Sequence, residues 1–292
     1  MVKELIHAVV VLPARGVRET WTLVARTRAA GWNSGRAYAR TTLTNYYIRI
    51  RNRLVRRPRA ACPCCGWSGY GFLMIDCGYF VVPEAECPHC GCHERHRMLH
   101  LYLYREQPGF FSARGRVLHV APEHQVRELL LRNPDLFCLS TDYPRQPPNG
   151  FPGTMILTDL QRLAIADNTF DFVFCLHVLE HVADDRQGIT EMWRILKPGG
   201  VAYLMVPFML GWEKTVEFGK PDPMMFDHVR GYSPNDFHDR LKPFRYEEIF
   251  PENFLTPDEV QQYRIPRDSQ VIYRCEKQPE EGSSGKRSDP SR

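Results

Sequence analysis

The chain has 292 residues, of which 43% are apolar and 25% are charged, so it can bury one full-sized α/β core and still form a smaller module. It contains no apolar run near the roughly 20 residues that cross a bilayer, which argues against a transmembrane segment. The apolar stretch 5–12 is short, is stopped by Pro13 and lacks a small-residue cleavage site. We therefore expect no signal peptide and a cytoplasmic protein.

The first segment, residues 1–59, is strongly basic. It carries 13 Lys and Arg against 2 Asp and Glu, a net charge of +11, whereas the rest of the chain carries 25 against 32, a net charge of −7. We interpret the segment as a solvated, partly helical arm. Because aromatic residues such as Trp21, Tyr46 and Tyr47 lie between the arginines, a surface for RNA, anionic lipid or a phosphorylated substrate is the alternative.

The second segment, residues 60–104, is rich in cysteine. Seven of the ten cysteines lie between Cys62 and Cys92, and such clustering indicates a metal rather than a disulfide framework. The pattern C-P-x-C-G occurs at 62–66 and again at 87–91. One tight turn can present both thiolates of each copy, and four thiolates complete a closed tetrahedral site. We predict a zinc-ribbon-like module with a linking helix, in which structural Zn²⁺ is bound by Cys62, Cys65, Cys87 and Cys90.

Some alternatives to this ligand set stay open. The choice of Cys62 over Cys64 as the partner of Cys65 rests on analogy with the second copy of the pattern. A redox pair is also possible, and His89, His93 and His96 are nearby alternative ligands.

The third segment, residues 115–276, alternates short apolar runs with amphipathic stretches, as βαβ units do. We predict strands at 117–121, 137–141, 154–157, 170–176, 201–206 and 271–275, and helices at 123–132 and 184–196. Such alternation indicates an α/β fold with a mostly parallel sheet, in which ligands bind beyond the carboxyl ends of the strands. The polar tail, residues 277–292, is predicted to be disordered.

A carboxylate ends the second predicted strand of this domain. Asp142, in Leu-Ser-Thr-Asp, can accept hydrogen bonds from both hydroxyls of a ribose, as acidic residues at this position commonly do. An ordinary turn aspartate beside Tyr143 and Pro144 is the alternative.

Several motifs taken in order are similar to those of the class I S-adenosylmethionine-dependent methyltransferases of the type 11 group. They are VLHVAPE, TDL, DNTFDFVFCLHVLEHV, ILKPGG and DHVRGY, within residues 115–245. The resemblance implies a Rossmann-like, seven-stranded sheet with a reversed final strand, and S-adenosylmethionine as cofactor. It further implies that Asp142 holds the ribose, that Asp159 holds the adenine amine with Leu160 against the ring, and that 175–177, beginning at Cys175, lies under the methyl donor.

The first loop departs from the family's pattern. By resemblance, residues from His119 to Glu123 line the methionine portion of the cofactor, but Ala121, Pro122 and Glu123 replace the usual glycines. We hypothesise that Glu123 contacts the cofactor's ammonium group.

The acceptor side should carry a base if the acceptor atom bears a proton. His177, His181 and His228 follow the fourth strand or lie in the long connection 207–232. We select His177 and His228 as catalytic candidates, and interpret His181 as support for its loop. Arg230, close to His228, could bind an anion.

The sequence leaves the acceptor open. We predict methyl transfer to a small molecule or a saccharide. An RNA methyltransferase that binds through the zinc module and the arm, and a non-catalytic binding protein with the same fold, are the alternatives. The oligomeric state is not indicated by any motif.

Overall fold

The computed structural model describes residues 15–77, 80–143, 153–266 and 270–279. Most of the predicted tail over 277–292 and the start of the arm lie outside the described residues. The chain divides into two compact units, Met1–His93 with Pro223–Phe226, and Glu94–Asp222 with Asp227–Arg292. In the part of the chain that is described, every helix is too short or too polar to span a bilayer.

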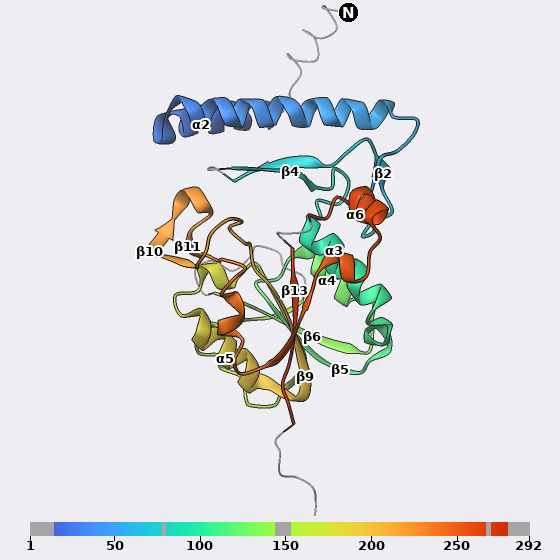
Figure 1. The fold of residues 1–292 in the computed structure, drawn as a ribbon, viewed down its shortest axis with the longest axis vertical. Coiled ribbons are helices and arrows are strands. Elements are labelled where there is room, and N and C mark those ends of the chain that lie inside the picture. The colour runs from blue at the N-terminus through green and yellow to red at the C-terminus, as the bar shows by residue number, and fades with distance from the viewer. Residues whose placement is uncertain (1–14, 78–79, 144–152, 267–269, 280–292) are drawn as a thin grey trace, which may run out of the picture. The chain divides into compact units, whose positions relative to one another are not determined.

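The first unit combines a 40-residue helix with two small antiparallel hairpins. The helix is α2 (Arg15–Leu54), and the hairpins pair β1 (Ala60–Ala61) with β2 (Ser68–Gly69) and β3 (Leu73–Asp76) with β4 (Val81–Glu86). Figure 1 shows α2 in blue and β4 in cyan.

Two asparagines hold α2 to the hairpin region of the same unit. Asn45 and Asn52 are seven residues apart, which places them on one face of the helix. The side chain of Asn45 accepts from the Met74 N–H at 2.7 Å and donates to the Met74 carbonyl at 2.9 Å. Asn52 accepts from the Tyr70 N–H at 2.7 Å. The described part of the basic arm and the described residues of 60–93 therefore belong to one unit.

The second unit contains a seven-stranded sheet with helices on both faces (Figure 1). The strands are β5 (Gly115–Val120), β6 (Leu136–Asp142), β7 (Thr154–Leu157), β8 (Phe170–Leu176), β9 (Leu196–Met205), β12 (Arg245–Ile249) and β13 (Ile272–Glu276). The helices are α3 (Glu94–Arg105), α4 (His124–Leu130), α5 (Asp185–Ile195) and α6 (Pro257–Tyr263), with short 3-10 turns at η1 (Pro108–Ser112), η2 (Leu179–His181), η4 (Phe237–Arg240) and η5 (Pro251–Asn253). A separate hairpin pairs β10 (Val216–Asp222) with β11 (His228–Gly231).

The strand order of the sheet is β12-β13-β9-β8-β5-β6-β7. Strands β5 to β9 pair in parallel, whereas β13 is antiparallel to both of its neighbours. The predicted α/β class, with a mostly parallel seven-stranded Rossmann-like sheet and a reversed final strand, is confirmed. Because the order changes direction between β5 and β8, the carboxyl ends of these two strands flank the place where such sheets bind ligands.

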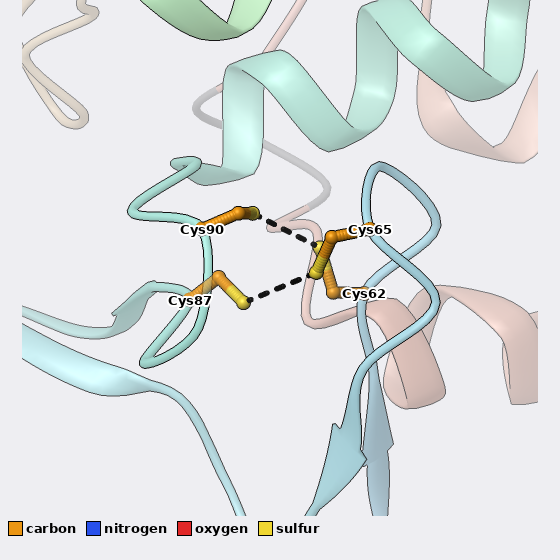
Figure 2. A group of neighbouring side chains, drawn as sticks. All are labelled: Cys62, Cys65, Cys87 and Cys90. Carbon is orange, nitrogen blue, oxygen red and sulfur yellow. Dashed lines mark hydrogen bonds between the residues drawn. The ribbon is translucent and has the colours of Figure 1, made fainter.

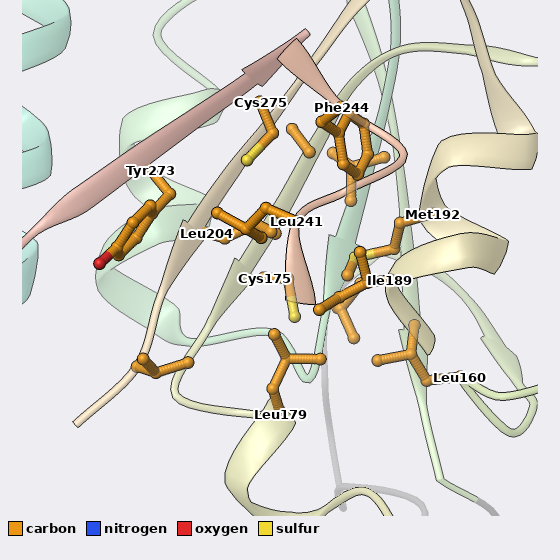
Figure 3. Packing of buried hydrophobic residues seen from close by; sticks show 14 of the residues in the cluster. Leu160, Cys175, Leu179, Ile189, Met192, Leu204, Leu241, Phe244, Tyr273 and Cys275 are labelled. Atoms are coloured by element: carbon orange, nitrogen blue, oxygen red, sulfur yellow. The ribbon is translucent and has the colours of Figure 1, made fainter. Parts of the chain in front are cut away.

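The core has one apolar cluster on each face of the sheet. Successive residues of a strand alternate between the clusters, as a sheet buried on both faces requires. In β8, Val173 and Cys175 belong to the cluster beside α5, and Phe174 and Leu176 to the cluster beside α3, α4 and α6. Figure 3 shows Cys175 packed among Leu179, Ile189 and Leu204.

Several segments differ from the predicted elements, and α6, β10 and β11 were not predicted. Residues 197–200, which lie between the predicted helix 184–196 and the predicted strand 201–206, already belong to β9, because the Gly199 N–H donates to the Lys277 carbonyl and the Lys277 N–H to the Gly200 carbonyl. The helix itself ends at Ile195. Strand β12 was not predicted, since its sequence RYEEI is charged and mostly exposed, as an edge strand can be.

Candidate functional site

The loop after β5 is fixed from two directions. Ala121 adopts a left-handed backbone with φ 45°, and its N–H donates to the Thr141 carbonyl of β6 at 2.7 Å. The Glu123 N–H points at Nε2 of His119, 3.4 Å away. His119 is 2% exposed, and burial lowers its pKa to about 4. The loop therefore has the turn that glycine usually supplies, although no glycine is present.

The carboxylate of Glu123 is already engaged by α3. Arg95 forms an ion pair with Oε1, and Nε2 of His96 lies 2.9 Å from Oε2. Burial raises the pKa of Glu123, but the hydrogen bond from His96 and the charge of Arg95 outweigh it and hold this pKa well below its usual range. The geometry favours a role for Glu123 in holding the loop to α3. The proposed contact with an ammonium group stays a hypothesis.

The two predicted nucleoside-binding carboxylates stand at neighbouring strand ends. Asp142 is the last residue of β6, and its strand partner is Leu157, the last residue of β7. Asp159 follows Leu157 by two residues. Among the described residues, Asp142 uses one carboxylate oxygen to accept the Tyr143 N–H at 2.7 Å. Both oxygens of Asp159 accept from the side chain of Gln161, at 3.0 and 3.1 Å. The structure thus brings both predicted residues to the same edge of the sheet.

Leu160 and Cys175 are buried in the apolar cluster beside α5 (Figure 3). Leu160 is 6% exposed and packs against α5 so closely that a Cβ on Gly188 would lie 3.2 Å from its Cγ. Cys175 is fully buried, and burial raises the pKa of its thiol. Both residues therefore have packing roles, whatever they contribute to a cofactor site.

Four ionisable side chains gather beyond the end of β8. Glu180 is 1% exposed, and its Oε1 lies 3.8 Å from Nδ1 of His177 and 3.9 Å from Nε2 of His228. The rings of His181 and His228 meet edge to face, with their centroids 4.7 Å apart. Burial raises the pKa of Glu180 to about 8 and lowers that of His228 to about 4. Both predicted catalytic histidines therefore meet around one buried carboxyl group.

Arg230 connects the two elements that carry this cluster. It is 3% exposed and donates to the carbonyls of Leu179 and Ala183, at 2.8 and 2.7 Å, and to the carboxylate of Glu217 at 2.9 Å. Its guanidinium therefore fixes the loop around η2 against β11. This use differs from the anion-binding role that we considered for it.

Sequence reasoning did not single out Glu180, although it lies inside a quoted motif. A carboxylate directly before a histidine at the end of a buried strand was the available signal. Arg95 was also missed, because its partner Glu123 is 28 residues away and no pattern joins them.

The cysteine site has two matching turns. The Gly66 N–H donates to the Cys62 carbonyl and the Gly91 N–H to the Cys87 carbonyl, both at 2.9 Å. Both glycines are left-handed, with φ 74° and 70°. Glycine is favoured in that conformation, which explains the G in the repeated pattern.

The four predicted ligands converge within 4.8 Å of one another (Figure 2). The Sγ atoms of Cys62 and Cys90 are 3.8 Å apart, and those of Cys65 and Cys87 are 3.9 Å apart. Tetrahedral zinc with bonds of about 2.3 Å separates its sulfurs by about 3.8 Å, so the residues fit this ion. Cys62 also belongs to a second group with Cys64 and Cys92, the latter 3.2 Å away.

The family match lies in the second unit. Residues 138–204 match the family model described as a methyltransferase domain. A ubiquinone biosynthesis O-methyltransferase of Rickettsia prowazekii is 32% identical over 84 residues, which are 29% of this chain and 31% of that protein. A demethylmenaquinone methyltransferase of Deinococcus radiodurans is 45% identical over 47 residues, 16% of this chain and 20% of that protein.

Solved structures match more of the chain at low identity. The structure of Burkholderia thailandensis 1,6-didemethyltoxoflavin-N1-methyltransferase with bound 1,6-didemethyltoxoflavin and S-adenosylhomocysteine aligns with a TM-score of 0.44 and 12% identity, over 64% of this chain and 78% of that one. This chain spans between 20% and 32% of the length of the curated relatives that it matches.

Proposed function

We propose that this chain, which carries a class I S-adenosylmethionine-dependent methyltransferase domain, transfers a methyl group to a small molecule or a saccharide. The proposal rests on one combined observation: the sheet has the strand order β12-β13-β9-β8-β5-β6-β7, and carboxylates stand at the ends of two neighbouring strands. Asp142 is the last residue of β6 and Asp159 follows the end of β7 by two residues, at the edge of the sheet where nucleotides bind in such folds.

The residues at this edge fit a sulfonium nucleoside. Asp142 would accept the ribose hydroxyls, and Asp159 would accept the adenine amine with Leu160 beneath the ring. The loop from His119 through Ala121 to Glu123 would line the methionine portion, with Cys175 behind the methyl group. When bound, S-adenosylmethionine supplies an electrophilic methyl group, and in-line positioning by the protein lowers the barrier.

The acceptor would approach from the histidine cluster. We propose that His228 and His177 face the acceptor, where an imidazole nitrogen can take the proton that leaves an acceptor hydroxyl or amine. Both surround Glu180, which supports a shared role. The names of the two curated relatives refer to ubiquinone biosynthesis and to demethylmenaquinone, which is compatible with a small-molecule acceptor.

The cysteine site is proposed to hold structural Zn²⁺. Four thiolates, whose sulfurs lie within 4.8 Å of one another, would fill a tetrahedral ion and leave no position for a substrate, so the ion would brace the first unit. The hydrogen bonds of Asn45 and Asn52 support α2 and this module acting together. The division into segments 1–59, 60–104, 115–276 and 277–292, and the cytoplasmic location, stay predictions.

Two measurements test the proposal. Calorimetry with S-adenosylmethionine should show one site, and Asp142→Asn should weaken binding, with exposed Asp135→Asn as the matched control. Labelled methyl groups should then pass to the small-molecule fraction of a cell extract. Binding that Asp142→Asn leaves unchanged would overturn the cofactor assignment, and binding without transfer to any fraction would indicate a non-catalytic protein.

The same extract decides between acceptor classes. Transfer to RNA would favour the alternative in which α2 and the zinc module bind nucleic acid. Such binding would weaken steeply with salt, because phosphate contacts release counterions. We expect the label in the small-molecule fraction.

A further inference from the structure

A carboxylate and two imidazoles meet at one point beyond the end of β8. Glu180, His181 and His228 each offer one ligand atom, and these three atoms all lie within 4.8 Å of one another. Glu180 and His181 come from η2, whereas His228 begins β11, 47 residues further along the chain. Two imidazoles and one carboxylate, with further positions open, form a ligand set typical of divalent first-row transition metals.

The carboxylate of Glu180 is buried beside imidazoles. Among the residues that the structure describes, no Lys or Arg forms an ion pair with Glu180, and its Oε2 is buried without a hydrogen bond. The groups that face its Oε1 are imidazoles, those of His177 and His228. Buried carboxylates in proteins are paired, neutralised or bound to metals, so this cluster suits a cation.

The two ligand-bearing elements are held in place before any ion binds. Arg230, two residues after His228, donates to the Leu179 carbonyl directly before Glu180 and to the Ala183 carbonyl two residues after His181. Asp185 accepts from Arg240 at 2.6 Å and from the Tyr232 hydroxyl at 2.7 Å. These contacts fix η2 and β11 from several sides, as a preorganised ligand set requires.

We propose that Glu180, His181 and His228 bind a divalent transition-metal ion, with open coordination positions toward the acceptor. Bonds of about 2.1 Å place neighbouring octahedral ligands about 3.0 Å apart and opposite ligands about 4.2 Å apart. The 3.9 Å between Oε1 of Glu180 and Nε2 of His228 lies between these two values, so both side chains would shift slightly to bind one ion. Small side-chain rotations would bring His181 to the same ion.

The site also indicates a class of acceptor, and this step rests on the proposed function. An ion beside the cofactor's methyl group would bind an oxygen donor, such as a hydroxyl or a vicinal pair of oxygens. Its charge would lower the pKa of that hydroxyl. With His228 bound to the ion, His177, 3.8 Å from Glu180 and outside the ligand set, would be the one of the two proposed imidazoles left to take the proton.

Equilibrium dialysis against Co²⁺, without S-adenosylmethionine or acceptor, tests the ion site separately from the proposed function. The number of bound ions per chain is compared between the wild type, Glu180→Gln and His228→Gln, with His124→Gln on α4 as the matched control. The cysteine site is the same in all four proteins, so the difference reports the new site. We expect the wild type and the control to bind one more Co²⁺ than either variant.

Circular dichroism should be used to check that each variant is folded. If one variant unfolds, the other still tests the ion site. Equal Co²⁺ binding in wild type, control and a folded variant would overturn the proposal. Calorimetry with S-adenosylmethionine on the same samples separates the two ideas. If the wild type binds the additional Co²⁺ but not S-adenosylmethionine, the proposed function alone is refuted. If it binds S-adenosylmethionine but no additional Co²⁺, the ion site alone is refuted.

Discussion

The carboxylate of Glu123 offers the sharpest test of how the cofactor loop is held. Glu123→Gln removes the charge that pairs with Arg95, and the two side chains are 22% and 14% exposed. Breaking a buried pair costs about 3–5 kcal/mol and an exposed pair contributes about 0.2–1 kcal/mol, so this partly buried pair should contribute about 2 kcal/mol. Urea unfolding should show this loss, whereas Glu128→Gln, at an exposed position of α4, should change stability by less than about 0.5 kcal/mol.

The free energy of unfolding that Glu123→Gln removes should decrease at low pH. The folded state lowers the pKa of Glu123, so its contribution is complete above the unfolded value of about 4.3 and fades as the pH falls below it. The difference between wild type and Glu123→Gln should therefore shrink in acid.

Cofactor affinity completes this test. Arg95 and His96 already occupy both oxygens of Glu123, so affinity for S-adenosylmethionine should stay within about threefold. A tenfold loss of affinity with unchanged stability would refute this reasoning and support a direct ammonium contact.

Three further substitutions test other parts of the molecule. Asp142→Asn removes a charge-assisted acceptor worth about 1.5–3 kcal/mol, so calorimetry should show S-adenosylmethionine affinity about 10- to 100-fold weaker. Ala121→Gly should leave the urea midpoint unchanged or higher, since glycine adopts a left-handed backbone without strain. The control Ala113→Gly, at φ −68°, should lower the midpoint. Equal decreases of the midpoint in both variants would contradict backbone strain at Ala121. Cys87→Ser should remove bound zinc, measured by metal analysis, while Cys138→Ser in β6 should retain it.

The predictable part of the fold follows from burial. The run 170–176, apolar except for Asp171, predicts β8 with the observed bounds because this central strand is covered on both faces. Strand β12 has no such signal, since it lies at an edge and its pairing with β13 needs little apolar surface. Where packing determines an element, the sequence is informative about it.

Some residues of the candidate site could be predicted from the sequence and others could not. Asp142 and Asp159 are predictable because each follows its own strand, and parallel strands end at one edge. The meeting of Glu180 with His228 is not, because it depends on how the β10–β11 hairpin folds back and on the hydrogen bonds of Arg230. Only the folded chain brings together groups 48 residues apart.

Three non-glycine residues of the site share one unusual backbone state. Ala121, His177 and Asp227 have φ of 45°, 53° and 62°, and lie directly after β5, after β8 and before β11. Such residues cost about 1–3 kcal/mol each and persist only where their surroundings determine them. Each N–H donates to a backbone carbonyl, that of Thr141, Met205 or Asp222, at 2.7–2.8 Å. The sheet and the hairpin thus impose the turns that present the candidate side chains, which explains how the first loop can take its shape without a glycine-rich sequence.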